Sequence, residues 1–188
     1  MRKIIFFFIG MIGAQAQTSS WSLEINYPIL VDQNFVGANF NGLVEVGTKY
    51  QFWENVSFKT GVSLHTGLFK DKEDIQGANI DFDLLVWTIQ PRIYGELFLP
   101  SFPKFHPMVG VGYSAVTFFT NGNVMTFFPQ GNETRYGFNV TAGFSLDVSK
   151  QWYFLANYDF IKLSNSGAFN SPYLQNINAV KVGVGYRI

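Results

Sequence analysis

The chain has 188 residues, no cysteine, a formal net charge of zero, 18% aromatic residues and only 14% charged residues. This balance excludes a disulfide framework and a basic patch for nucleic acid. Mean hydropathy is +0.10, and beyond the N-terminus no run approaches the roughly 18 uninterrupted apolar residues of a transmembrane helix. Such a composition is typical of membrane-spanning strands, in which apolar and polar residues alternate.

The N-terminus has the three parts of a secretory signal peptide. Arg2-Lys3 is the positive region, residues 4–13 form an apolar run too short to span a membrane, and Ala14-Gln15-Ala16 is a small-residue cleavage site. We therefore predict a signal peptide over residues 1–16 and a mature barrel domain over residues 17–188.

Eight stretches follow in which apolar residues alternate with polar residues or glycine, the period-2 pattern of a strand. In chain order they cover about residues 20–27, 42–53, 56–68, 83–99, 105–119, 134–148, 151–163 and 176–188. The connections between them alternate between long and short, as antiparallel barrels with long outer loops and short periplasmic turns require. Pro91 interrupts the fourth stretch, and because proline lacks a backbone donor we expect a bulge there.

The apolar face of these stretches carries no charge until Lys162, near the end of the seventh. A charge at mid-bilayer on this face would cost about 2–4 kcal/mol, so the face is predicted to meet lipid. Because lipid tolerates no open sheet edge, the sheet must close. We predict an all-β fold, an eight-stranded antiparallel up-and-down transmembrane β-barrel. Two interfacial girdles are expected, at Trp21, Trp53, Trp152 and Tyr186 and at Tyr27, Trp87, Tyr136 and Tyr158.

The opposite face is predicted to line a polar interior. An eight-stranded barrel is just wide enough for side chains to fill it, so we expect a structural network of paired charges, with inward glycines leaving room for the longer side chains. A proton or ion path is the alternative. The predicted network consists of Glu24, Glu45, Lys49, Lys59, Arg92, Glu96, Arg135, Asp147, Asp159, Lys181 and Arg187.

The sequence gives only weak indications of a catalytic or metal-binding site. Ser63 and His65 share the inward face, and an inward acid would complete a triad, but two residues at this spacing are common by chance. His106, in a predicted short turn, is interpreted as interfacial. The acids Asp71, Glu73, Asp74, Asp81 and Asp83 do not have calcium-loop spacing. We predict no catalytic residue, no metal and no cofactor.

The signal peptide, the eight strands, the run Val109-Gly110-Val111-Gly112-Tyr113 and the ending Gly183-Val184-Gly185-Tyr186-Arg187-Ile188 resemble the small outer-membrane β-barrel family, which includes OmpX-type, OmpA-type and PorT-like proteins. The resemblance implies a bacterial outer-membrane location with both termini periplasmic. It also implies contact with outer-membrane lipid and lipopolysaccharide, and insertion by the barrel-assembly machinery through the C-terminal strand.

The function expected from this reading is non-enzymatic: long extracellular loops that serve adhesion, ligand binding or envelope integrity. An extracellular ligand or a secretion or gliding component would be the partner, and nucleic acid would not. The alternative is a lipid-modifying enzyme, similar to a lipid A deacylase, on the same barrel. A soluble lipocalin-like barrel is rejected, because it would bury the eleven charges in an apolar calyx or expose the aromatic face to water.

Overall fold

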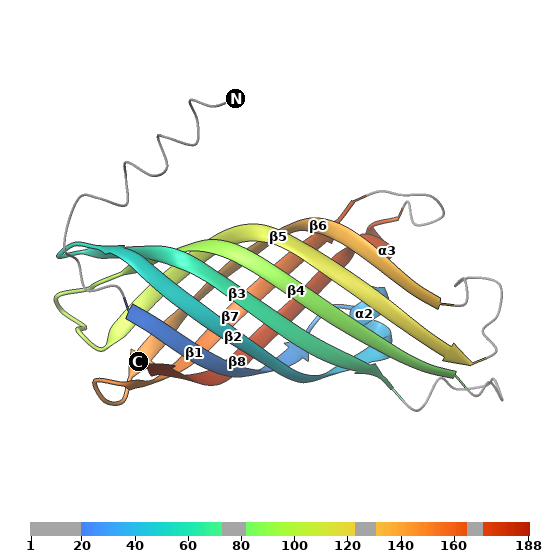
Figure 1. The fold of residues 1–188 in the computed structure, drawn as a ribbon, viewed down its shortest axis with the longest axis horizontal. Coiled ribbons are helices and arrows are strands. Elements are labelled where there is room, and N and C mark those ends of the chain that lie inside the picture. The colour runs from blue at the N-terminus through green and yellow to red at the C-terminus, as the bar shows by residue number, and fades with distance from the viewer. Residues whose placement is uncertain (1–19, 73–81, 123–130, 165–170) are drawn as a thin grey trace, which may run out of the picture.

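The computed structural model describes residues 20–72, 82–122, 131–164 and 171–188. It is a closed barrel of eight antiparallel strands in sequence order, with β1 paired to β8 (Figure 1). The predicted signal peptide lies outside the described residues. The elements are β1 (Ser20–Leu30), α2 (Phe35–Asn39), β2 (Phe40–Glu54), β3 (Phe58–Asp71), β4 (Phe82–Leu97), β5 (Phe105–Gly122), β6 (Gly131–Asp147), β7 (Trp152–Leu163), α3 (Pro172–Gln175) and β8 (Asn176–Arg187).

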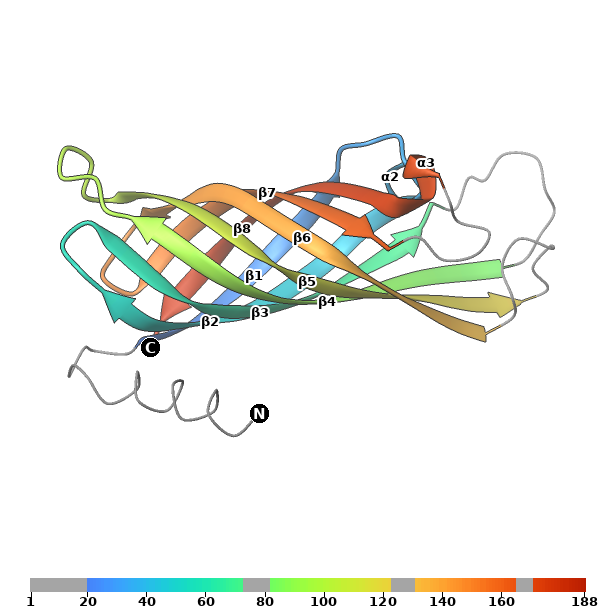
Figure 2. The same cartoon turned by 90° about the horizontal axis from the view of Figure 1, so that it is seen from above.

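The two ends of the barrel differ. One end, the turn end, carries the short β2–β3, β4–β5 and β6–β7 connections and the C-terminus (Figures 1 and 2). At the other end, the loop end, β3, β5 and β7 end, β4, β6 and β8 begin, and α2 and α3 lie (Figures 1 and 2). Within the described residues, no helix is long and apolar enough to cross a membrane.

All eight predicted strands and the closed antiparallel topology are confirmed. Several strands extend further towards the loop end than the alternation indicated. β3 runs to Asp71 rather than to Leu68, and this extension puts Lys70 on the outer face in line with Leu68. A second outward lysine therefore joins Lys162 at the loop end.

The predicted bulge at Pro91 is wrong. Pro91 pairs with Leu64 of β3, and the register between β4 and β5 is the same before and after it, at Ile89↔Ala115 and Arg92↔Gly112. The proline removes a ladder bond without inserting a residue. The register instead shifts twice in β2, between Gly42 and Val44 and between Gln51 and Trp53. Each shift lets two successive apolar side chains face outward, which the strict period of 2 could not reveal.

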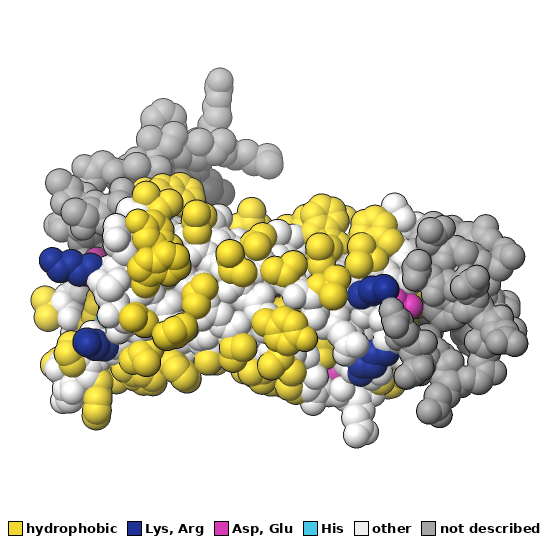
Figure 3. Space-filling model, turned by 90° about the horizontal axis from the view of Figure 1, so that it is seen from below, with side chains coloured by type: hydrophobic (Ala, Val, Ile, Leu, Met, Phe, Trp, Pro, Cys, Tyr) yellow, Lys and Arg dark blue, Asp and Glu magenta, His cyan; other side chains and the backbone are white. Residues whose placement is uncertain are grey.

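The outer wall is apolar along its length. On the face shown in Figure 3, hydrophobic side chains run along the barrel and cationic side chains gather near its two ends. The predicted girdles lie on this outer wall, where Trp152 and Tyr186 make ring contact at 5.0 Å between centroids. The exposed members are Trp21, Trp53 and Trp152 at the turn end and Tyr27, Trp87, Tyr136 and Tyr158 nearer the loop end. Lipid therefore solvates this face, with amphipathic rings at both of its borders.

The interior has two zones, and the prediction of a polar interior holds only for the half nearer the turn end. In the half nearer the loop end, side chains of α2 and of every strand from β2 to β8 except β6 form one apolar cluster. The cluster consists of Val36, Phe40, Phe69, Leu84, Val86, Val116, Phe118, Ile161, Leu163 and Ile177, with Leu30 and Phe35 packed against it. The alternation pattern did not predict this apolar cluster, because runs such as Leu84-Leu85-Val86-Trp87 are apolar on both faces.

α2 closes the loop end of this cluster. The predicted long connection after β1 contains this short helix, and the helix buries Val36 on the cluster. The ammonium of Lys72 donates to the carbonyl oxygens of Gly37 and Ala38 at the helix C-terminus, at 3.0 Å each. Gly37 is required for close approach, because a Cβ there would lie 1.9 Å from the carboxylate of Asp32. The helix is thus tied down by contacts that side-chain alternation does not encode.

The same loop is fastened to β8 by Asp32. Its Oδ2 accepts from the backbone N–H of Asn178 at 3.0 Å, from the Asn178 amide at 2.6 Å and from the Asn34 amide at 2.8 Å. These bonds hold the start of the connection against the wall beside α2. The loop end is therefore closed by an anchored cap, at least in the part described.

Phe40→Ala should lower the free energy of unfolding by about 3–5 kcal/mol, because Phe40 is almost fully buried in the apolar cluster and its removal leaves a cavity. Urea unfolding in phospholipid vesicles, followed by tryptophan fluorescence, measures the change. Phe52→Ala is the matched control on the same strand, since Phe52 faces outward and lipid refills the space it leaves. Equal losses for the two variants would contradict the two-zone interior.

Candidate functional site

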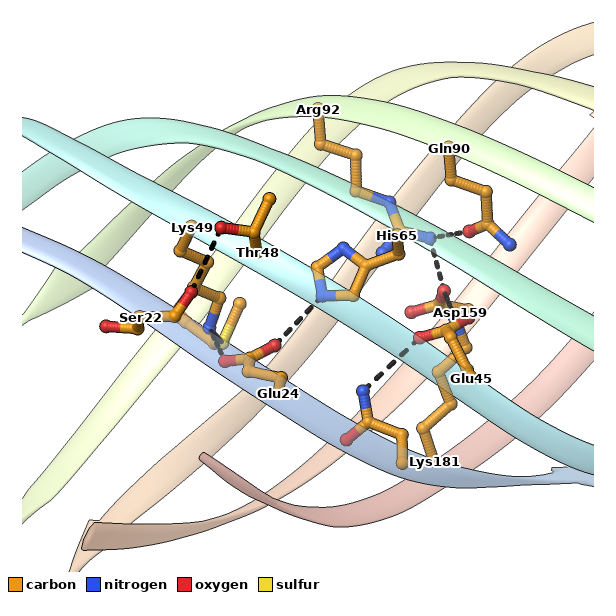
Figure 4. Close-up of polar contacts among 12 residues, drawn as sticks. Ser22, Glu24, Glu45, Thr48, Lys49, His65, Gln90, Arg92, Asp159 and Lys181 are labelled. Carbon is orange, nitrogen blue, oxygen red and sulfur yellow. Dashed lines mark hydrogen bonds and ion pairs between the residues drawn. The ribbon is translucent and has the colours of Figure 1, made fainter. Parts of the chain in front are cut away.

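The polar half of the interior is organised around the carboxylate of Glu24 in β1 (Figure 4). One of its oxygens accepts from the Lys49 ammonium at 2.6 Å and from the Tyr153 hydroxyl at 2.8 Å. The other lies 2.9 Å from Nε2 of His65. Glu24 has almost no exposed surface, and Lys49 and His65 are buried with it. A single buried acid therefore joins side chains from four strands.

Two glycines explain why these partners reach Glu24. In the register, Gly47 of β2 and Gly185 of β8 stand directly beside Glu24, and His65 and Tyr153 stand one strand further out on either side. A Cβ at Gly47 would lie 2.1 Å from the His65 ring, and one at Gly185 would lie 2.1 Å from the Tyr153 ring. Both rings thus lean over a glycine to reach the carboxylate. At these two positions the inward glycines make room for aromatic rings, whereas the sequence predicted room for long cationic side chains.

A second group lies on the inner wall nearer the apolar cluster. The Lys181 ammonium pairs with Glu45 and, at 2.5 Å, with Asp159. The guanidinium of Arg92 also pairs with Asp159, and its Nε donates to the Asn139 amide oxygen at 2.7 Å. Gly112 stands between Arg92 and Asn139 in the register, so the same arrangement of a glycine between two bonded side chains recurs.

Neutral side chains extend this second group around the barrel. Asn139 donates to the Ser114 hydroxyl at 2.8 Å, and Asn26 donates to Glu45 at 3.3 Å. Gln90 accepts from Arg92 (Figure 4) and donates to the Thr88 hydroxyl at 3.1 Å. None of these amides was singled out in the sequence, although each lies on the inward face of its strand.

A third group lies at the turn end. Asp147 accepts from Arg187 at 2.6 Å and lies 3.1 Å from Nε2 of His106, and the Arg187 guanidinium lies 4.6 Å from the centroid of the Tyr153 ring. The interpretation of His106 as an interfacial residue is wrong: it belongs to β5, points inward and is fully buried. The strand begins at Phe105, as predicted, and its alternation directs His106 into the barrel; the turn interpretation came from the prolines beside it.

The remaining predicted charges lie apart from these groups. Lys59 stands opposite Glu96 in the register, and its ammonium lies 4.3 Å from the centroid of the Phe98 ring. Arg135 is inward and buried but lies towards the loop end, where it pairs with Glu133 of its own strand. The structure therefore brings together Glu24 with Lys49, Asp147 with Arg187, and a group of four, but it does not join all eleven residues in one network. The group of four is Glu45, Arg92, Asp159 and Lys181.

The electrostatics of the central groups are balanced. Three carboxylates, Glu24, Glu45 and Asp159, face three cations, Lys49, Arg92 and Lys181, and every one of them is buried. Burying a charge is costly unless an opposite charge and hydrogen bonds compensate it, and here both are present. The paired charges thus fill this part of the barrel, and each of these six charged groups is engaged by an opposite charge.

The residues considered for catalysis lie in this filled interior. Ser63 and His65 are buried on the inward face of β3, and Nε2 of His65 is occupied by Glu24. Lipid on the outer wall does not reach either side chain. Of the acids considered for calcium, residues 73, 74 and 81 lie outside the described residues. Among the described residues, no group of three or more His, Cys, Asp or Glu side chains is placed to hold a metal ion.

Comparison with known proteins agrees with this architecture. Residues 4–187 match the model of the family described as the outer membrane protein beta-barrel domain. Among curated proteins, none matches the sequence significantly.

Solved structures share the fold at low identity. The attachment invasion locus protein Ail of Yersinia pestis, in complex with the heparin analogue sucrose octasulfate, is 14% identical with a TM-score of 0.58, over 90% of this chain and 97% of that one. Neisserial surface protein A is 12% identical with a TM-score of 0.58, over 92% and 97%. The N-terminal barrel of Pseudomonas aeruginosa OprF is 13% identical with a TM-score of 0.53, over 91% and 100%.

Glu24→Gln should destabilise the barrel by about 3–5 kcal/mol, because it leaves the Lys49 ammonium buried without its counter-charge. Urea unfolding in vesicles measures the loss. The double variant Glu24→Leu with Lys49→Met should regain most of the lost free energy of unfolding, because an apolar pair of similar volume removes both buried charges. A silent Glu24→Gln would show that Glu24 does not organise the interior.

Proposed function

Because this chain belongs to the outer membrane protein β-barrel domain family, we propose that it is a non-enzymatic barrel whose loop end faces the outside of the cell and acts there. The filled interior is the observation that carries this proposal. Ion pairs occupy the half nearer the turn end and the apolar cluster occupies the other half. An eight-stranded barrel filled in this way is a scaffold, so its function belongs to a surface.

The loop end is the surface best suited to this role. The outer wall is apolar and lies in the membrane, and the turns at the opposite end are short. At the loop end α2 and α3 lie together, and the Phe35 and Tyr173 rings meet edge to face at 6.3 Å between centroids. Tyr173 is also half exposed, and exposed aromatic side chains are frequent anchors in binding surfaces.

The role that we favour for the loop end is adhesion or ligand binding, and envelope integrity is the other role that it could serve. The proposal is supported by Ail, a barrel of the same fold, which was solved in complex with a heparin analogue. The enzyme alternative gains no support, because Ser63 and His65 are buried away from lipid. The proposal includes lipopolysaccharide around the barrel, periplasmic termini and insertion by the barrel-assembly machinery through β8. A secretion or gliding component is a further candidate partner.

The orientation is testable because the chain has no cysteine of its own. Gln33→Cys and Tyr173→Cys, both exposed at the loop end, should react with a membrane-impermeant maleimide on intact cells. Ser149→Cys, exposed in a turn at the opposite end, should react only after lysis. Labelling of the turn cysteine in intact cells would reverse the orientation.

Surface binding is tested with cells that display the protein. Cells carrying the wild type should adhere to immobilised sulfated polysaccharide or extracellular matrix more than cells in which residues 73–81 and 123–130 are replaced by short Gly-Ser linkers. The control replaces residues 55–57 of the β2–β3 turn, and faster migration of the unboiled barrel on SDS gels verifies folding of each variant. If replacing residues 73–81 and 123–130 leaves both adhesion and the detergent resistance of the cells unchanged, the loop end serves neither ligand binding nor envelope integrity.

A further inference from the structure

The outer wall contains an apolar groove near the loop end, with a volume of about 420 Å³. This volume lies within the range of small-molecule sites, about 300–1,000 Å³. The groove crosses four strands and is lined by Val44, Val46, Thr66, Leu68, Leu85, Trp87 and Phe119. A lipid-facing wall needs no groove in order to meet disordered hydrocarbon, so this hollow requires its own explanation.

Its shape follows from the order of side-chain sizes. Thr66 and Leu68 of β3 lie between the valines of β2 and the larger rings of Trp87 and Phe119. The Trp87 indole N–H donates to the Thr66 hydroxyl at 2.5 Å. This bond holds the ring in place and gives Thr66, the polar residue of the lining, a hydrogen-bond partner. The groove is therefore preformed and apolar, and it suits a narrow hydrocarbon chain.

A cation marks the end of this groove nearer the loops. Along β3 the outward face continues from Thr66 and Leu68 to Lys70, which pairs in the register with Leu85. Among the side chains the structure describes, only Lys70 and Lys162 are charged on the outer face of the strands. A lysine ammonium has three donors, so it can meet a phosphate beside any other contact it makes.

We propose that this groove is a binding site for one acyl chain of a phosphorylated glycolipid in the outer leaflet, with the glycolipid phosphate against Lys70. The inference rests on the proposed orientation, which puts the groove in that leaflet. Hydrocarbon matches the apolar lining, and the phosphate matches the cation where the strand leaves the membrane. The site would hold one lipid in place beside the surface loops.

The fluorescence of Trp87 can report on occupation of the groove. Of its four tryptophans, Trp87 alone lines the groove, so a variant with Trp21, Trp53 and Trp152 changed to Phe reports on this site only. In vesicles of brominated phosphatidylcholine the bromine should quench Trp87. Adding phosphorylated lipid A should restore the fluorescence with saturation, and dephosphorylated lipid A should bind about fivefold more weakly, the effect expected for one lysine near an anionic headgroup.

Matched variants separate the site from bulk lipid. Val46→Phe, which fills the groove, should abolish the saturable recovery, whereas Val111→Phe, outward on β5 but away from the groove, should not. Lys70→Gln should reduce the affinity for phosphorylated lipid A to that for the dephosphorylated form, and Lys162→Gln should leave it unchanged. Faster migration of each unboiled variant on SDS gels verifies folding.

Two results would overturn the inference. If the Trp87 fluorescence rises in proportion to the mole fraction of lipid A, and does so equally in the Val46→Phe variant, the groove holds only bulk lipid. Recovery that depends on protein concentration without added lipid A would mean that a second copy of the chain covers it. Neither result bears on the orientation, which the cysteine labelling decides separately.

Discussion

The bonds around the Glu24 carboxylate are the interaction on which the interior depends. This acid is fully buried and joins Lys49, His65 and Tyr153, which come from three other strands. A buried carboxylate without these partners would be costly, so the strand register that assembles them is stabilised against slippage. The glycines beside it, Gly47 and Gly185, are part of the same constraint, because any side chain there would block the rings.

The division of the interior into two zones follows from what each zone must satisfy. Near the turn end, paired charges and amides fill a space that meets water at its mouth, where Asp147 and Arg187 remain partly exposed. Near the loop end, an apolar cluster under α2 excludes water without needing partners for polar atoms. A barrel filled in both of these ways leaves its outer wall and its two ends as the surfaces open to partners.

Particular residues show how far sequence reasoning reached. Lys181 and Arg187 were directed inward by a clean alternation in β8, and the structure places both there. His106 was misplaced because Pro103 and Pro107 beside it suggested a turn, although the alternation of the strand that begins at Phe105 directs it inward. Val86 and Phe118 were missed as interior residues because apolar side chains lie on both faces of their strands near the loop end, and a period of 2 cannot distinguish such faces.

The sequence by itself determined the architecture, since eight alternating stretches with an uncharged apolar face have one stable solution in lipid, a closed antiparallel sheet. It also determined which charges face inward along each well-patterned strand. Only the tertiary structure decided which of those charges meet, because pairing across the barrel depends on register and on bulges such as those in β2. It likewise decided that α2 caps the loop end and that a groove forms beside Trp87, since both depend on contacts between residues distant in the chain.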